Sequence, residues 1–249
     1  MHGKDNITVS QPKDISNTNW LRTQDGSNTL VHPEHGQSYH SLAGAWSECI
    51  EVFLKPVLAY AETQAWQEWH VLDVGFGLGL NWLCFVDHAR RVGQNLRVDS
   101  LENDESLLHL PAPQNLPHWD LIDTTANQGV APESLALLKK FKINRECVEN
   151  HVNARLHLAD ANDTLQRWQS AAVPKFNIIL QDAFSAQVNP KLWDDAYFSR
   201  LAGVCSPQAI LVTYAAASSV QRALKAAGFV VTKCPGFGGK RERLVAIKD

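Results

Sequence analysis

Glycines directly after a short apolar run are the first residues that could do chemistry. Residues 70–83 read HVLDVGFGLGLNWL, and Gly75, Phe76, Gly77 and Gly79 stand between an expected strand and an expected helix. Glycines there let the backbone turn sharply and approach a ligand with no Cβ in the way. The helix N-terminus adds free N–H groups and a partial positive charge. The spacing fits NAD, FAD or S-adenosylmethionine, and it also fits a tight turn that binds nothing.

Three acidic residues at the ends of later strands discriminate between these ligands, because open α/β sheets bind ligands at the carboxyl ends of their strands. Glu102 can accept both hydroxyls of a ribose, and Asp160 is placed to contact an adenine amino group. Each of these acids could instead cap the next helix. Capping explains Asp160 alone as well as ligand contact does, but it is the weaker explanation for Glu102, Asp160 and Asp182 together. A pyrophosphate sits poorly beside carboxylates. The sulfonium and ammonium of S-adenosylmethionine suit them better, so the acids favour that cofactor.

Alternating strand and helix patterns, from residue 66 to the C-terminus, would position these residues. Apolar runs that end in an acid, such as residues 96–104 and 175–183, indicate strands, and the stretches between such runs have helical spacing. The last two runs, residues 229–235 and 241–249, are joined by a short GFGGK and should pair as antiparallel neighbours. The pattern predicts an α/β, Rossmann-like fold: seven mostly parallel strands with an antiparallel last strand, covered on both faces. That ending favours a methyltransferase-type sheet over a plain dinucleotide fold.

The N-terminal quarter of the chain has a different pattern. Residues 1–20 are polar, lack the apolar core of a signal peptide, and predict a flexible lead-in. Residues 21–65 begin with glycine and proline punctuation around short β-prone runs, which predicts a hairpin. A helical pattern follows, and Pro56 should end or kink it. The expected division is therefore a lead-in, an extension packed on the core over 21–65, and a methyltransferase domain over 66–249.

Composition limits the class of protein. The 249 residues are 45% hydrophobic and 20% charged, with a formal net charge of −3, as in a globular protein with little general affinity for nucleic acid. No apolar stretch is long enough to span a bilayer. Five scattered cysteines without a CxxC pair indicate free thiols in a reducing cytoplasm. His32 and His35 lie close together but lack a partner at ligand spacing, so we expect a surface loop and no metal.

Three motifs together carry a family resemblance. They are VGFGLGLNWL (residues 74–83), QDAFSAQVNPKLW (181–193) and GFGGKRERLVA (236–246). They resemble the methyltransferases that make 5-methylaminomethyl-2-thiouridine at the tRNA wobble position, the MnmD type, which is equivalent to the N-terminal half of the bifunctional MnmC enzyme. The resemblance covers nearly the whole chain, about residues 20–248. Its most specific parts are the run that begins at Asp182 and the terminal Gly-Phe-Gly-x-Lys-Arg.

The resemblance implies methyl transfer from S-adenosylmethionine to a primary amine on the uridine side chain. It assigns catalysis to Asp182, which can bind the ammonium, orient it and receive or relay its proton. The implied cofactor-binding residues are Gly75, Phe76, Gly77, Gly79, Glu102, Asp160 and Asp182. No cysteine nucleophile is expected. The departures from the family pattern, which are Asp73, Leu78 and Ala186 in place of the usual glutamate, threonine and proline, remove none of these carboxylates.

Substrate contacts are expected from both ends of the chain. The resemblance places Tyr39, Glu48 and Phe184 near the substrate base, with packing as an equal alternative for the first two. It places Lys240 and Arg241 on phosphates of the tRNA anticodon loop. The alternative for this pair is a solvated hairpin, since a basic C-terminal patch on charge alone is ordinary surface. Trp193 is either part of a stacking wall or a core residue.

Other functions remain compatible with these patterns. They are a methyltransferase or aminopropyltransferase acting on a small free amine, a non-catalytic protein that binds RNA or a partner, and an NAD oxidoreductase. The GFGGKR hairpin favours tRNA over a free amine, and the intact glycines and acids favour catalysis. Because the sequence stops at Asp249, we expect no FAD-dependent oxidase half and methylation only. A separate FAD oxidase or the upstream wobble-uridine pathway would then supply the amine.

Overall fold

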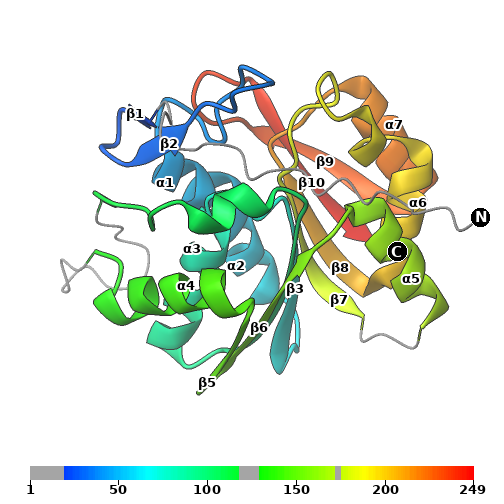
Figure 1. Cartoon of the computed structure of the whole chain (residues 1–249). Helices are drawn as coiled ribbons and strands as arrows, with labels where there is room; N and C mark the ends of the chain where they lie inside the picture. Colours follow the sequence, from blue (N-terminus) through cyan, green and yellow to red (C-terminus); the bar gives the residue numbers. More distant parts are fainter. Residues whose placement is uncertain (1–19, 118–128, 172–174) are drawn as a thin grey trace, which may run out of the picture.

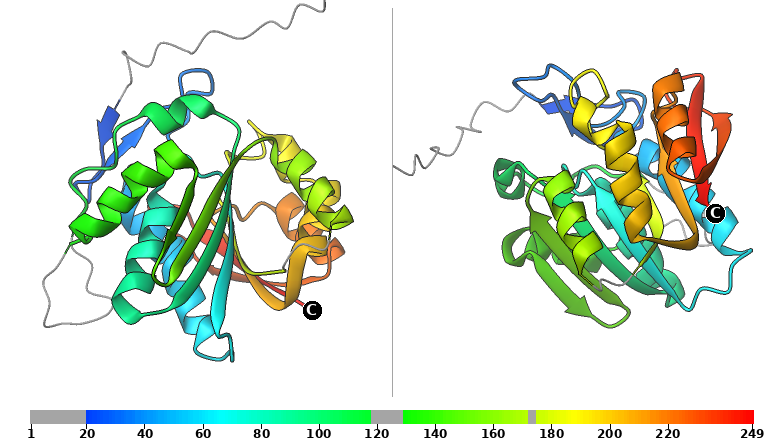
Figure 2. Two further views of the ribbon diagram at one scale, coloured as in Figure 1. Left: turned by 60° about the horizontal axis from the view of Figure 1, so that its bottom comes forward. Right: turned by 90° about the vertical axis from the view of Figure 1, so that its right-hand side faces the viewer.

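One twisted sheet runs through the molecule, with helices packed on both faces (Figure 1, Figure 2). The computed structural model describes residues 20–117, 129–171 and 175–249, so the expected lead-in lies outside the described residues except for Trp20. The strands of the sheet are β3 (Glu68–Val74), β4 (Asn95–Glu102), β5 (Glu146–Glu149), β6 (Val152–Leu158), β7 (Phe176–Gln181), β8 (Cys205–Thr213), β9 (Phe229–Pro235) and β10 (Glu242–Lys248). Their order across the sheet is β5-β6-β4-β3-β7-β8-β10-β9.

The five central strands, from β6 to β8, run parallel, so their carboxyl ends meet at one edge of the sheet. Strand β10 is antiparallel to both β8 and β9, which confirms the predicted ending. The prediction of seven strands is wrong: the described residues form eight, because β5 adds an antiparallel edge strand beside β6. Only Cys147 of this four-residue strand is buried, and so short a segment carries no recognisable alternation.

Helices cover the sheet in two layers. On one face lie α3 (Leu80–Val92), α4 (Pro132–Asn144) and the N-terminal helix, and on the other lie α5 (Ala161–Ser170), α6 (Asp195–Val204) and α7 (Ser218–Ala226). Ile178 packs in the first layer and Ile179 in the second, because successive strand residues point to opposite faces. This double burial accounts for the continuous apolar run in β7. Among the described helices, none is long and apolar enough to cross a membrane.

The N-terminal extension forms the predicted hairpin, made of β1 (Trp20–Arg22) and β2 (Asn28–Leu30), followed by a helix. The helix runs through α1 (Ala45–Glu48), a π-helical segment (Cys49–Leu54) and α2 (Lys55–Ala61). Pro56 does not end it: the proline lies in the first turn of α2, directly after the wide π turns. A proline lacks an N–H and clashes with the carbonyl four residues earlier, and a widened turn accommodates both effects.

Asp25 ties the hairpin to the start of α1. Its Oδ1 accepts hydrogen bonds from the backbone N–H and hydroxyl of Ser27, and its Oδ2 accepts from the backbone N–H (2.9 Å) and hydroxyl (2.8 Å) of Ser47. Burial alone would raise the pKa of Asp25, but these hydrogen bonds and one from Thr23 outweigh it and lower the pKa to about 2. The carboxylate therefore acts as a remote cap for α1, whose flanking Gly44 offers no side chain to do so.

Candidate active site

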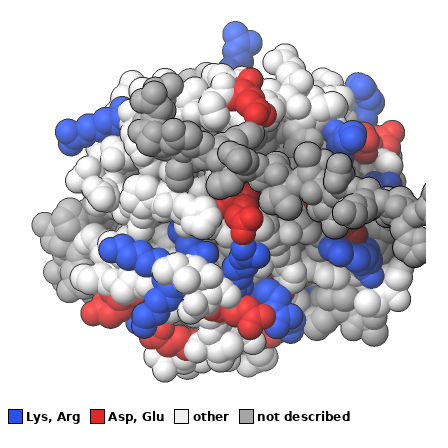
Figure 3. Space-filling view, viewed as in Figure 1, with Lys and Arg blue, Asp and Glu red and all other residues white. Residues whose placement is uncertain are grey.

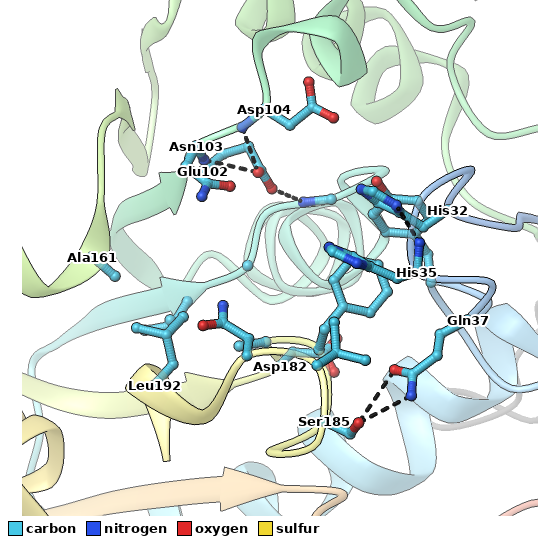
Figure 4. Close-up of a pocket in the computed structure, with 18 of the residues that line it drawn as sticks. His32, His35, Gln37, Glu102, Asn103, Asp104, Ala161, Asp182, Ser185 and Leu192 are labelled. Carbon is cyan, nitrogen blue, oxygen red and sulfur yellow. Dashed lines mark hydrogen bonds between the residues drawn. The ribbon is translucent and has the colours of Figure 1, made fainter. Parts of the chain in front are cut away.

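A pocket of about 680 Å³ opens at the carboxyl edge of the sheet, between the strand ends and the N-terminal extension (Figure 4). Most of the residues singled out in the sequence line it. They are Tyr39, Glu48, Gly75, Gly77, Glu102, Asp160, Asp182, Phe184 and Lys240. Four do not line it: Phe76, Gly79, Trp193 and Arg241. The tertiary structure thus gathers both ends of the chain around the carboxyl ends of β3, β4 and β7.

The glycine loop shapes the pocket, but its N–H groups are already engaged within the protein. Gly75 and Phe76 donate to the carbonyl of Leu101 (3.1 and 3.0 Å), and Gly77 donates to Oε2 of Glu102 (2.9 Å). These three loop amides are therefore not free to bind a ligand, and the free N–H groups expected for the site belong to the start of α3, at Leu80. Gly75 has a φ of 89°, and a Cβ there would lie 2.8 Å from the carbonyl oxygen of Asp182. The glycine therefore allows the loop after β7 to approach, and the engaged amides argue against a bound pyrophosphate.

Phe76 and Gly79 lie behind the pocket and contact the helices there. Phe76 is buried and packs edge-on against Phe141 of α4, with ring centroids 5.8 Å apart. Gly79 precedes α3 with a φ of 84°, and a Cβ there would lie 2.9 Å from side-chain atoms of both Phe76 and Leu138. Both residues are thus placed to support the glycine loop from beneath, because their nearest neighbours belong to the core and not to the pocket.

Glu102 is held in one orientation by three backbone donors. Oε2 accepts from Gly77, and Oε1 accepts from Asn103 (2.8 Å) and Asp104 (2.9 Å), as Figure 4 shows. Burial raises the pKa of the Glu102 carboxyl, and the three hydrogen bonds oppose that rise. A carboxylate with its position fixed and further acceptor capacity suits a pair of ribose hydroxyls.

Asp160 both caps a helix and lines the pocket. Its side chain accepts a hydrogen bond from the backbone N–H of Asp163 (3.2 Å) at the start of α5, so it caps this helix without leaving the pocket lining. Ala161 lies beside it at the far end of the pocket from His35 in Figure 4. Sequence reasoning missed Asp104, which also lines this region. The run Leu-Glu-Asn-Asp (residues 101–104), in which β4 ends, could have indicated it.

Asp182 follows β7 and lies in the middle of the pocket (Figure 4). The side-chain amide of Asn81, on the first turn of α3, donates a 2.7 Å hydrogen bond to its Oδ2. Burial raises the pKa of Asp182 well above that of an ordinary aspartate, and the nearby Glu48 and Asp73 raise it further, while Asn81 and Lys240 oppose the rise. A carboxylate with a raised pKa accepts a proton from an amine more readily than an ordinary one.

Glu48 is a second carboxylate in the same pocket and is buried, with 4% of its surface exposed. Its Oε2 accepts a 2.7 Å hydrogen bond from the backbone N–H of Ser41, and its Oε1 lies 3.6 Å from Nζ of Lys240. Burial raises the pKa of Glu48, and Lys240 opposes that rise. Lys240 also lies over the ring of Tyr214, 3.9 Å from its centroid. Its ammonium thus contacts the pocket interior, which the expectation of a phosphate contact had not included.

Charge in the pocket is unbalanced. The carboxylates of Glu48, Glu102, Asp104, Asp160 and Asp182 face only two lysines, Lys191 and Lys240. On the face of the molecule that Figure 3 shows, basic and acidic side chains are instead interspersed. The excess of negative charge in the pocket favours ligands that carry positive charge.

Aromatic rings form one side of the pocket, and two of them are unexpected. His32 and His35, for which we expected a plain surface loop, line the pocket beside Tyr39 and Phe184. Trp193 is 3% exposed and donates its indole N–H to the carbonyl of Phe184 (2.7 Å), so it is a core residue. Among the described residues, no group of three or more His, Cys, Asp or Glu side chains could hold a metal ion.

The fold and the site together define the S-adenosyl-L-methionine-dependent methyltransferase class. The defining features are this strand order, the glycine loop after the central strand β3, and the acids at the ends of β4 and β7. A family model described as "S-adenosyl-L-methionine-dependent methyltransferase" matches residues 126–249. By its fold and by this match the chain is an S-adenosyl-L-methionine-dependent methyltransferase, with S-adenosyl-L-methionine as its cofactor.

The relatives that the chain resembles have names that state a more specific activity than the family description does. It is 30% identical over 232 residues to the tRNA 5-methylaminomethyl-2-thiouridine biosynthesis bifunctional protein MnmC of Azoarcus sp. (strain BH72), covering 89% of this chain and 34% of that protein. It is 32% identical over 231 residues to the protein of the same name from Paraburkholderia phymatum, covering 87% of this chain and 33% of that protein. The chain thus spans about a third of the length of these relatives. The crystal structure of MNMC2 from Aquifex aeolicus matches with a TM-score of 0.70 and 26% identity, covering 94% of this chain and 71% of that one.

Proposed function

We propose that this protein methylates the primary amine of 5-aminomethyl-2-thiouridine, or its unthiolated form, at the wobble position of tRNA, giving the 5-methylaminomethyl nucleoside. The observation that carries the proposal is the pair of carboxylates formed by buried Glu48 and half-buried Asp182, both with raised pKa values, in a pocket with excess negative charge. An alkylammonium is the substrate class that such a pair suits. The named activity of the relatives, tRNA 5-methylaminomethyl-2-thiouridine biosynthesis, supports the identity of the amine.

The residues of the pocket fit the cofactor. The fixed carboxylate of Glu102 would accept the ribose hydroxyls, and Asp160 with Ala161 would face the adenine. Gly75 and Gly77 line the part of the pocket between Glu102 and Asp182, where the absence of side chains leaves room. When bound, S-adenosyl-L-methionine supplies a methyl group already activated by its positively charged sulfur. Little covalent help from the protein is then required.

The task left to the protein is to orient the amine and to remove its proton. An aliphatic amine is mostly protonated in water and carries no lone pair for reaction in that state. Asp182 holds the ammonium and takes its proton at Oδ1, because Oδ2 is engaged by Asn81. Glu48 provides the second acceptor for the amine N–H groups. Burial of both carboxylates strengthens these contacts and raises both pKa values towards that of the amine.

We place the reaction in the cytoplasm and the contact in the anticodon loop. Arg241 lies outside the pocket, next to Lys240, and suits a phosphate beside the wobble nucleotide. Tyr39 and Glu48 reach the pocket from the extension over residues 21–65, so we assign this segment to substrate binding and residues 66–249 to cofactor binding and catalysis. A separate FAD oxidase or the upstream wobble-uridine pathway would supply the amine.

The test is nucleoside mass spectrometry of tRNA that carries the free amine, after incubation with the protein and S-adenosyl-L-methionine. We expect the wobble nucleoside to gain one methyl group. Asp182→Asn should lower the rate by at least about 100-fold, the scale of a lost proton acceptor, while calorimetry shows cofactor affinity close to wild type. Methylation of a small free amine but not of tRNA would contradict the proposal, and so would an active Asp182→Asn variant.

A further inference from the structure

The aromatic side of the pocket is built from two segments that are far apart in sequence. The first is a loop closed by the bridge between Val31 and Ser38 and by the hydrogen bond from the His32 N–H to the carbonyl of Gln37 (2.8 Å). The second follows Asp182. Gln37 Nε2 donates to the hydroxyl of Ser185 (3.0 Å), which joins the two segments (Figure 4). The rings carried by both segments are therefore held in one fixed arrangement.

Four rings form a continuous cluster in this arrangement. The imidazoles of His32 and His35 are stacked, with centroids 4.1 Å apart and 16° between their planes. Phe184 meets both of them edge-on, at 5.3 Å from His32 and 5.5 Å from His35. The ring of Tyr39 lies 5.0 Å from that of Phe184, and it packs on Gly77, where a Cβ would lie 3.3 Å from it. The cluster thus extends from the glycine loop to the rim of the pocket.

The rim of this cluster is open to a ligand. His32 is 7% exposed, and its Nδ1 accepts hydrogen bonds from the backbone N–H groups of Glu34 and His35 (3.2 Å each), which fixes the lower ring of the stack. His35 is exposed, while Tyr39 and Phe184 are half-buried. Exposed π faces beside a polar pocket are surfaces on which nucleobases stack, whatever the sequence around the base.

The position of the ring cluster suits the substrate base and not the adenine of the cofactor. Phe184 is two residues from Asp182, so a base held against these rings is next to the reacting carboxylate. An amine on a pyrimidine C5 is two bonds from the ring and can reach Asp182 only from such a place. The adenine of the cofactor is expected at the other end of the pocket, because Ala161 and Leu192 lie opposite His35 and Gln37 in Figure 4.

We infer that His35, stacked on His32 and backed by Phe184 and Tyr39, forms the platform on which the unstacked wobble uracil or thiouracil lies during methylation. The inference rests on the proposed function and adds the residues that select a nucleobase over a free amine. A base taken out of its stack needs a compensating surface, and these rings offer one.

The activity test compares three variants of the full chain on a synthetic anticodon stem–loop RNA with 5-aminomethyl-2-thiouridine at the wobble position. His35→Ala should raise KM for this RNA about tenfold and leave cofactor affinity by calorimetry unchanged. His35→Phe should restore KM, because stacking requires only a flat ring. The matched control is His151→Ala, an exposed histidine at the opposite edge of the sheet that should match wild type. A His35→Ala variant with wild-type KM, or with weakened cofactor binding instead, would overturn the inference.

A second measurement does not depend on activity. The same RNA with 5-iodouridine at the wobble position forms a covalent link, under ultraviolet light, to an aromatic ring stacked on it. We expect the cross-linked peptide to contain residues 32–39 or Phe184, and the cross-link to weaken in His35→Ala. A cross-link mapped to other residues would overturn the platform. If the wild type still methylated the RNA, the proposed function would stand. If wild type methylates no RNA, the proposed function fails first.

Discussion

The side-chain amide of Asn81 donates a 2.7 Å hydrogen bond to Oδ2 of Asp182, across 101 positions in the sequence. Asn81 lies on the first turn of α3 and Asp182 follows β7, so the bond joins the helix after the glycine loop to the reacting carboxylate. It fixes which oxygen of Asp182 is engaged and which remains for the substrate. Asn81 is therefore a positioning residue, and it lowers the pKa of Asp182 against the effect of burial.

Replacing Asn81 with alanine should slow methylation about 10- to 100-fold at neutral pH, the scale of a lost hydrogen bond to a charged group. Without this donor the pKa of Asp182 rises further, so the carboxylate needs a higher pH to ionise. The acidic limb of the kcat–pH profile should then move to higher pH, which a purely structural defect would not cause. Thermal unfolding checks that the variant is folded, and an unshifted profile would remove Asn81 from the site.

Glu102→Ala should weaken cofactor binding by about 1–3 kcal/mol, because the fixed acceptor for the ribose hydroxyls is lost. Three backbone N–H groups, those of Gly77, Asn103 and Asp104, also lose their acceptor. Calorimetry with S-adenosyl-L-methionine measures the change, with the exposed Glu62→Ala as the matched control. Wild-type affinity in Glu102→Ala would show that the carboxylate does not contact the cofactor.

Lys240 and Arg241 should behave differently although they are adjacent. Arg241→Ala should weaken RNA binding and reduce the slope of log K against log salt by about 0.7–0.9, the value of one phosphate contact. Lys240→Ala should leave that slope nearly unchanged, because its ammonium lies against Glu48 and Tyr214. Since Lys240 lowers the pKa values of Glu48 and Asp182, its loss should shift the kcat–pH profile to higher pH.

Filter binding over a range of salt concentrations and a kcat–pH profile separate these two roles. Equal losses of salt slope in both variants would mean that Lys240 contacts phosphate after all. An unchanged slope in Arg241→Ala would return Arg241 to ordinary surface.

Asp73 should make stability depend on pH near neutrality. Its carboxyl lies fully buried on β3 with a hydrogen bond from Ser100 (2.9 Å), and burial raises its pKa to about 7 from 3.8. The folded state thus holds this proton more tightly than the unfolded state does. Relative to an aspartate of ordinary pKa, Asp73 leaves the free energy of unfolding unchanged below pH 3.8. It lowers that free energy progressively as pH rises from 3.8 to about 7, and the loss is complete above that range.

Asp73→Asn removes this titration. The free energy of unfolding of the wild type should fall relative to that of the variant by about 2–4 kcal/mol between about pH 5 and about pH 8. Urea unfolding at the two pH values measures it. An identical pH dependence in both proteins would show that Asp73 does not titrate in this range.

Local sequence patterns were sufficient to predict the loop and the strand ends that form the site. The glycine loop and the acids at the ends of β4, β6 and β7 lie at the carboxyl edge of the sheet, because apolar runs and the residues that end them are features of contiguous sequence. Glycine spacing did not reveal that the amides of Gly75 and Gly77 are already bonded to Leu101 and Glu102. Those acceptors belong to the next strand, and only the packed sheet brings them within reach.

By itself the sequence determined the alternation of strands and helices, the cofactor-type loop and the identity of the carboxylates, since each depends on neighbours a few residues away. Only the tertiary structure decided that His32 and His35 stack beside Phe184, about 150 positions later, and that Asn81 holds Asp182. It also decided the raised pKa values of Glu48 and Asp182. A pKa depends on how much water the fold removes and on which charges it brings close, and neither quantity is written in the local order of residues.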